Sequence, residues 1–306
     1  MKAIATEQRN PRSRGLDTKS TLDILKILNS EDAKVAIAVR RQLSQIAKAA
    51  DAIAQAWSLG GRLIYVGAGT SGRLAVLDAA ECPPTFGTKP RMVRAIIAGG
   101  NRALRHAVEG AEDSFADGAR DLRRAKLSAR DVVVGIAASG TTPYVLGAIE
   151  FAKSRGASTV GVTSNPGSPV ARAARIAIAP QTGPEALSGS TRLKAGTAQK
   201  MVLNLLSTTA MICSGRVYEN WMVHVALTNK KLQRRGIRIL EEAAGVTPSQ
   251  AEHALRQSKH NLPAALVMLK TGMNAAAAAA LLVKTNGNVR QAIAMNSRVR
   301  KQSGRR

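Results

Sequence analysis

Five continuous apolar runs, separated by segments with helical spacing, constrain the fold of this chain more than any other feature. Uninterrupted apolar runs are typical of strands buried on both faces, which occur in parallel sheets covered by helices on either side. Aromatic residues make up only 3% of the chain, so the predicted core consists mainly of Ala, Val, Ile and Leu. The sequence therefore predicts an α/β protein with a doubly wound parallel sheet. The five runs lie at 62–67, 92–98, 131–138, 158–163 and 174–179.

The segments on either side of the predicted sheet have a different pattern. Residues 1–18 predict an irregular arm, and apolar residues at helical spacing then predict a helix from Ser20 or Thr21. The same spacing predicts one longer helix from Ser30 to the Gly60–Gly61 pair. From Glu241 onward the chain has no strand pattern, and Pro and Gly punctuation predicts three short helices.

The predicted organisation has four parts. These are an N-terminal arm with helices that pack on the core at 1–54, a sheet domain at 55–240, a small helical domain at 241–298 and a basic tail at 299–306.

Cysteine, histidine and apolar-run patterns exclude several classes of protein. Cys82 and Cys213 lie outside any CxxC pattern, and the four histidines lack HxxxH or HExxH spacing. We therefore expect reduced thiols and no metal site. The start of the chain has no apolar core of a signal peptide, and no run approaches the ~18 apolar residues that a membrane span needs. The sequence predicts a cytoplasmic protein that does not contact a membrane.

The formal net charge of +25 raises the possibility of nucleic-acid binding. However, the cations are spread along the chain, with a cluster only at its end, and aromatic side chains for base stacking are scarce. We expect no specific nucleic-acid recognition. A generally basic surface that attracts anionic metabolites is the preferred interpretation.

Two Gly- and Ser/Thr-rich turns follow predicted strands, at 67–73 and 138–143. Ligands of open α/β folds bind at the carboxyl ends of the strands, and helix N-termini there favour anions. The first turn contains GxGxxG, which also occurs in dinucleotide-binding folds. Asp78 comes too early for the ribose-binding acid, and no acid ends the next strand near Ala98. Two such turns favour one phosphate held by two loops, as in a phosphosugar site.

Three further segments carry residues suited to chemistry. Glu81 precedes Pro83 and Pro84, where a helix is expected to stop, so its carboxylate would sit at a stiff helix end. Glu109 and Glu112 share one face of a helical turn. The segment 185–200 combines a carboxylate, hydroxyls and cations before a long helix. The alternatives are a surface acid, a solvated acidic face and a helix-capping loop, respectively.

Taken together, these stretches resemble the N-acetylmuramic acid 6-phosphate etherase family, and the match runs in order along almost the whole chain. The Glu-Cys-Pro-Pro segment is not expected in generic sugar-isomerase (SIS) domains. The matching stretches are Thr6–Glu7 with Asn10, Gly67–Leu74, Asp78–Thr85, His106–Ser114, Asp131–Tyr144, Gly189–Lys200, and Thr228–Leu232 with Arg235.

The resemblance implies an SIS-type fold. By analogy, the three predicted C-terminal helices resemble a small domain of the ubiquitin-associated (UBA) type. The resemblance to the etherase family also implies cleavage of the 3-O-lactyl ether of N-acetylmuramic acid 6-phosphate, without a metal or redox cofactor. By resemblance, Glu81 is the acid that protonates departing lactate and later activates water, and Glu112 is the base at C2. The family acts as a homodimer with the site near the interface. The residues implied for the phosphate are Thr70, Ser71, Ser139, Gly140 and Thr142, and those implied for the sugar are Glu185 and Lys194.

Other interpretations stay open at this point. Related SIS proteins bind phosphosugars as non-catalytic regulators of kinases, and loss of either glutamate would favour that role. An aldose–ketose phosphosugar isomerase would use Glu185 as its base. Thr141 and His224 depart from the expected pattern, because some relatives have arginine and an acid at these positions.

Overall fold

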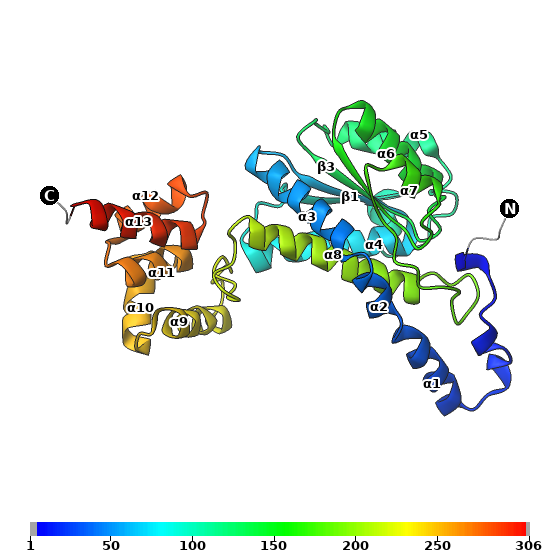
Figure 1. Ribbon diagram of the computed structural model, residues 1–306, viewed down its shortest axis with the longest axis horizontal. Helices are drawn as coiled ribbons and strands as arrows, with labels where there is room; N and C mark the ends of the chain where they lie inside the picture. Colours follow the sequence, from blue (N-terminus) through cyan, green and yellow to red (C-terminus); the bar gives the residue numbers. More distant parts are fainter. Residues whose placement is uncertain (1–4, 304–306) are drawn as a thin grey trace. The chain divides into compact units, whose positions relative to one another are not determined.

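The computed structural model describes residues 5–303, with side chains described for residues 6–296. Five parallel strands form one sheet in the order β2-β1-β3-β4-β5 (Figure 1). All five predicted strands are confirmed. They are β1 (Leu63–Gly67), β2 (Val93–Ile97), β3 (Val132–Ile136), β4 (Ser158–Val162) and β5 (Ile176–Ile178).

Helices cover both faces of the sheet, as the apolar runs predicted (Figure 1). Ile64, Val66 and Val133 pack into one core cluster with residues of α5 (Phe115–Arg124), α6 (Pro143–Ser154) and α7 (Pro169–Ala173). Because side chains alternate along a strand, Tyr65 points to the opposite face. There its hydroxyl donates to Asp78 of α4 (Gly69–Phe86) at 2.9 Å. The predicted doubly wound α/β architecture is confirmed.

The first α-helix begins at Thr21, as predicted, but the arm before it contains three short 3-10 helices, η1 (Ala5–Glu7), η2 (Pro11–Ser13) and η3 (Leu16–Thr18). Ser20 caps α1 (Thr21–Asp32) by accepting from the Asp23 N–H at 3.2 Å. The prediction of one long second helix is wrong, because the chain breaks at Arg41–Gln42 into α2 (Val35–Arg40) and α3 (Leu43–Ser58). The break places Gln42 Oε1 3.0 Å from the N–H of Ala179, just after β5.

Helix α4 does not stop before its prolines, contrary to the prediction. It runs through Pro83 and Pro84 to Phe86. Proline's fixed φ is itself helical, so two prolines near the end of a helix remove hydrogen bonds without forcing the chain out of the helix. The Gly87 N–H closes the last turn on Pro83 O at 2.9 Å.

The chain divides into two compact units. The sheet unit comprises Met1–Ala80 and Pro90–Ala210, and the helical unit comprises Glu81–Lys89 and Met211–Arg306. Both α4 and α8 (Lys194–Cys213) contain a boundary between the units. The four-part division at residues 54, 240 and 298 stays a prediction.

The helical unit has its own buried core, formed mainly by its C-terminal helices. After Glu241 the sequence predicted three helices, but four begin there, because Gly272 ends α11 in a left-handed conformation and Asn274 caps a further helix. The likeness to a UBA domain stays a prediction. The helices of this part are α9 (Lys230–Ala244), α10 (Pro248–Gln257), α11 (Leu262–Thr271), α12 (Ala275–Lys284) and α13 (Val289–Ser303).

Part of the predicted basic tail lies in α13, and residues 304–306 lie outside the described residues. Within the described residues, no single helix is long and apolar enough to cross a membrane. Helices α11 and α12 meet the length and composition criterion only as a pair, and they are bent by 109°.

Candidate phosphosugar site

The first predicted loop joins β1 to α4 at the carboxyl edge of the sheet. Gly69 begins the helix with φ +50°, and the N–H groups of this first turn precede the first bond back into the helix, from Gly72 N to Ala68 O. Thr70 is half-buried and Ser71 is buried. The Ser71 hydroxyl donates to Gln199 Oε1 of α8 at 2.9 Å. The loop therefore has the free amides that favour an anion, and its serine is held by α8.

The second predicted loop joins β3 to α6. The hydroxyls of Ser139 and Thr141 lie 2.9 Å apart. Gly140 has φ +74°, and a Cβ atom there would lie 2.1 Å from Ser168 Oγ, so only glycine fits. Thr142 precedes α6 as its N-cap residue, with no side-chain capping bond. Asn165 donates to Ser139 O at 3.0 Å and fixes the loop from the end of β4.

The sheet brings these two loops together. Strands β1 and β3 are paired neighbours, and Gly67 is in register with Ile136. Each loop leaves its strand just after this register pair. The expectation that two loops share one edge of the sheet is therefore met, with the N-termini of α4 and α6 at the same edge.

Glu112 lies beside the second loop. Its backbone carbonyl accepts from the Tyr144 N–H at 3.0 Å, and its side chain is exposed. Tyr144 is two residues after Thr142, so the hydrogen bond ties the Glu112 turn to the N-terminus of α6. Glu109 of the same turn is also exposed. No sequence signal indicated this backbone contact.

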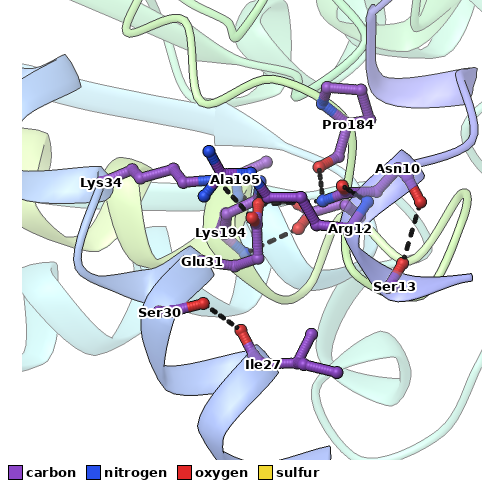
Figure 2. A network of polar contacts seen from close by, with 11 residues as sticks. Asn10, Arg12, Ser13, Ile27, Ser30, Glu31, Lys34, Pro184, Lys194 and Ala195 are labelled. Atoms are coloured by element: carbon purple, nitrogen blue, oxygen red, sulfur yellow. Dashed lines mark hydrogen bonds and ion pairs between the residues drawn. The ribbon is translucent and has the colours of Figure 1, made fainter. Parts of the chain in front are cut away.

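Glu185 and Lys194 are buried rather than exposed at the loops. Figure 2 shows Lys194 within a network of polar contacts. Glu185 is 0% exposed, and its two oxygens accept from the N–H groups of Lys194 and Ala195 at 3.0 and 2.9 Å. The carboxylate thus caps the start of α8, which is the capping interpretation of this segment. Burial raises the pKa of Glu185, although these backbone hydrogen bonds act to lower it.

The Lys194 side chain bonds to the N-terminal helices. Its Nζ pairs with Glu31 Oε2 at 2.5 Å, and both side chains are 2% exposed. Asn10 of the N-terminal arm donates to the same Glu31 oxygen at 2.9 Å and to Pro184 O at 3.2 Å (Figure 2). Lys34 also pairs with Glu31. Burial alone would raise the pKa of Glu31, but the hydrogen bonds from its partners lower it to about 2.

Asp78 and Gln199 are buried polar residues to which the sequence gave no role in the site. Asp78 accepts from Asn204 Nδ2 at 2.8 Å and from Ser207 Oγ at 3.1 Å, so it links α4 to α8. Burial raises the pKa of Asp78, against the hydrogen bonds it accepts. Gln199 makes the second side-chain link between these helices, to Ser71. The one sequence signal for a role of these two residues is that both lie in stretches that match the etherase family.

In the helical unit, Glu81 is exposed on α4. His224, the other residue of interest there, bonds through Nε2 to Gly287 O at 3.0 Å. Burial and the nearby Arg216 lower the pKa of His224 to about 4. Among the described residues, no group of three or more His, Cys, Asp or Glu side chains is placed to hold a metal ion.

Comparison with curated proteins shows to which family this chain belongs. The chain is 55% identical to an N-acetylmuramic acid 6-phosphate etherase of Edwardsiella ictaluri over 291 residues, covering 95% of this chain and 97% of the relative. It is 53% identical to the protein of the same name from Photorhabdus laumondii, with 95% and 96% covered. The chain belongs to the N-acetylmuramic acid 6-phosphate etherase family. The resemblance found in the motifs is thereby confirmed.

The etherase relatives match the helical unit as well as the sheet unit, since the alignments cover 95% of the chain. A family model described as the glucokinase regulatory protein N-terminal SIS domain matches residues 45–153, and an SIS-domain model matches residues 112–209. A solved structure from Bacteroides fragilis, of a protein assigned as a phosphosugar isomerase involved in capsule formation, has the same fold. It has a TM-score of 0.50 and 17% identity, covering 64% of this chain and 92% of that one.

Proposed function

We propose that this chain cleaves the 3-O-D-lactyl ether of N-acetylmuramic acid 6-phosphate, yielding N-acetylglucosamine 6-phosphate and D-lactate. The observation that carries this is the 51–55% identity to proteins of that name over 95% of the chain. The two Ser/Thr loops at one edge of the sheet support a phosphosugar ligand. The reaction belongs to the cytoplasmic catabolism of amino sugars from peptidoglycan.

The proposed reaction is a carbon–oxygen lyase step followed by hydration. In the open-chain sugar the C1 carbonyl acidifies the C2 proton, so a carboxylate suffices as base. Glu112 takes that proton, the C3–O bond breaks, and a C2=C3 double bond forms. Glu81 gives its proton to the leaving lactate oxygen and then takes one from the water that adds at C3. Glu112 returns a solvent-exchanged proton to C2 as the water adds, so both carboxyl groups end in their starting states. Each positioned proton transfer contributes about 10²–10⁴-fold, and no metal is required.

The proposed phosphate ligands are Thr70, Ser71, Ser139, Gly140 and Thr142. Support comes from the first-turn amides of α4 and from the Gly140 turn, which only glycine can form. Glu185 and Lys194 are proposed to shape the sugar side of the site through the start of α8, since their own polar groups are engaged in the buried network. An isomerase that uses Glu185 as base is not favoured, because both carboxylate oxygens accept backbone N–H groups.

We also propose a homodimer. In the sheet unit, Leu22 and Leu25 of α1 are 61% and 56% exposed. Ile37 of α2 is 53% exposed. Leu22 and Leu25 are three residues apart on α1 and share one helix face, and exposed apolar side chains that cluster are typical of an interface. Sedimentation at micromolar protein, with Leu22→Glu and Leu25→Glu as variants, tests this: the wild type is expected to be a dimer and the double variant a monomer.

Isotope incorporation tests the elimination route. The reaction is run in D₂O and separately in H₂¹⁸O, and the sugar product is examined by NMR and mass spectrometry. The proposal predicts deuterium at C2 and ¹⁸O at C3 of N-acetylglucosamine 6-phosphate. Product without deuterium at C2 would contradict elimination and indicate direct displacement of lactate.

A further inference from the structure

Gln199 is a buried amide of α8 that has no part in the proposed reaction. Its side chain is 2% exposed, and its Oε1 accepts the 2.9 Å hydrogen bond from Ser71 Oγ. Among the described residues, nothing accepts a hydrogen bond from its Nε2. Buried polar atoms in proteins nearly always have a partner, so a buried donor without one needs an explanation.

The present direction of the Ser71–Gln199 hydrogen bond is unfavourable for an anion. A serine hydroxyl has one hydrogen to donate, and that of Ser71 goes to Gln199. Phosphate oxygens are acceptors, so the Ser71 side chain binds phosphate only after this hydrogen is released. The first-turn amides of α4 need no such change. Phosphate binding by the Ser71 hydroxyl therefore requires a rearrangement at the Ser71–Gln199 contact.

The amide group allows the rearrangement without repacking. Its oxygen and nitrogen are similar in size, and rotation about the terminal bond is broad and roughly two-fold. After a half-turn, Nε2 donates to Ser71 Oγ, and the Ser71 hydrogen points to the phosphate. Two hydrogen bonds are formed and one is lost: the unpartnered nitrogen acquires an acceptor, and Oε1 gives up the hydrogen that it accepted from Ser71.

We propose that Gln199 is a positioning residue that turns the Ser71 hydroxyl toward the phosphate of the substrate by presenting its amide N–H to Ser71. The inference rests on the proposed function, because it takes the α4 loop as the phosphate site. The same part of α8 borders this loop elsewhere: Thr70 Cγ2 lies 3.6 Å from the position that a Cβ atom would take at Gly196. Helix α8 thus lies beside both hydroxyl residues of the first loop.

Two variants of Gln199 separate the direction of the hydrogen bond from the shape of the side chain. Gln199→Met keeps the length and loses the donor, so Ser71 is no longer oriented. Gln199→Glu keeps the shape, but its carboxylate only accepts and holds the Ser71 hydrogen more strongly. A hydrogen bond to a charged group is worth roughly 10- to 100-fold in affinity. We expect Gln199→Met to weaken binding about 10-fold and Gln199→Glu about 100-fold.

Calorimetry with N-acetylglucosamine 6-phosphate and with inorganic phosphate measures these affinities independently of lactate release. A double-mutant cycle with Ser71→Ala tests whether Gln199 acts through Ser71. The inference predicts that Ser71→Ala/Gln199→Met binds no more weakly than Ser71→Ala alone. In the lactate assay, KM rises for Gln199→Met while kcat changes less than about threefold. Losses that multiply in the double variant, or unchanged affinity in Gln199→Met, would overturn the inference.

Asn204→Leu is the matched control for a purely structural role. It removes the hydrogen bond from Asn204 of α8 to Asp78 of α4 without touching the loop, while Ser207 still donates to Asp78. We expect lower thermal stability and unchanged phosphate affinity. An affinity loss equal to that of Gln199→Met would contradict the inference, because it would mean that phosphate affinity depends only on how firmly α8 is attached to α4. If the wild type binds the phosphosugar with this dependence on Gln199 but releases no lactate, the proposed function fails and the inference stands.

Discussion

The backbone carbonyl of Glu112 accepts a 3.0 Å hydrogen bond from the N–H of Tyr144, at the N-terminus of α6. This bond fixes the turn that carries the proposed C2 base to the helix that carries the proposed phosphate loop. The Glu112 side chain remains exposed at this position. The arrangement suits a base that must reach a bound sugar whose phosphate is held nearby.

Glu31→Gln is expected to destabilise the sheet unit strongly. The substitution leaves the Lys194 ammonium buried without its counter-charge, which costs about 3–5 kcal/mol. Lys34→Gln is the control, since the Lys34 side chain is 40% exposed and its pairing should contribute less than about 1 kcal/mol. Urea unfolding at pH 7 measures both. Equal stability of Glu31→Gln and wild type would contradict a structural role for the network.

Glu31 also makes stability depend on acid. Its folded pKa of about 2 is below the ordinary value of about 4.5. As the pH falls, Glu31 is protonated in the unfolded chain before it is protonated in the folded protein. The contribution of Glu31 to the free energy of unfolding is therefore fully present above pH 4.5 and is lost as the pH falls toward 2. In Glu31→Gln this part of the acid dependence should be absent. Comparing free energies of unfolding at pH 5 and pH 3 checks this.

Gly140→Ala is expected to disrupt the second loop. The added Cβ would lie 2.1 Å from Ser168 Oγ, and φ of +74° is strained for alanine. We expect a loss of stability of at least about 1–3 kcal/mol and no detectable binding of N-acetylglucosamine 6-phosphate. Gly167→Ala is the matched control, because nothing lies within 4 Å of its added Cβ. Wild-type binding by Gly140→Ala would show that the loop does not hold the ligand.

Prediction from sequence succeeded where the pattern is local and repeated. Apolar runs marked all five strands, because the strands of a helix-covered parallel sheet are mostly buried, although Arg94 of the edge strand β2 is exposed. Because the carboxyl ends of parallel strands lie at one edge of a sheet, the sequence also indicated that the loops at Gly67 and Ala138 lie at the same edge. The break at Gln42 was missed, since apolar spacing continues across it and only the tertiary bond to Ala179 marks it. The end of α4 was predicted too early, because proline's φ is compatible with a helix and the hydrogen bonds lost at Pro83 and Pro84 did not end it.

The sequence analysis also did not predict the buried ion pair and its hydrogen bonds. Asn10, Glu31 and Lys194 are far apart in sequence and each reads as an ordinary surface residue. The structure buries all three in one network, and Glu185 caps α8 beside it. Composition and spacing carry no signal for such long-range pairs. The resemblance singled out Asn10 and Lys194 as family positions but could not give their contact with Glu31.

The low pKa of His224 predicts that the stability of the helical unit depends on pH. Its folded pKa of about 4 is below the ordinary value of about 6.5, so the unfolded chain binds more protons between these values. Stability should fall by about 2 kcal/mol from pH 7 to pH 5. His224→Gln, whose side-chain N–H can still bond to Gly287 O, should lack this fall. Chemical unfolding followed by circular dichroism at the two pH values distinguishes the outcomes.

The central claim is ether cleavage by a pair of carboxylates, and D-lactate release from N-acetylmuramic acid 6-phosphate tests it most directly. The account predicts release by the wild type and a loss of at least about 10²-fold in both Glu81→Ala and Glu112→Ala. Glu109→Ala, on the same exposed turn as Glu112, should retain activity. Folded wild-type protein that binds the phosphosugar and releases no lactate would contradict the account.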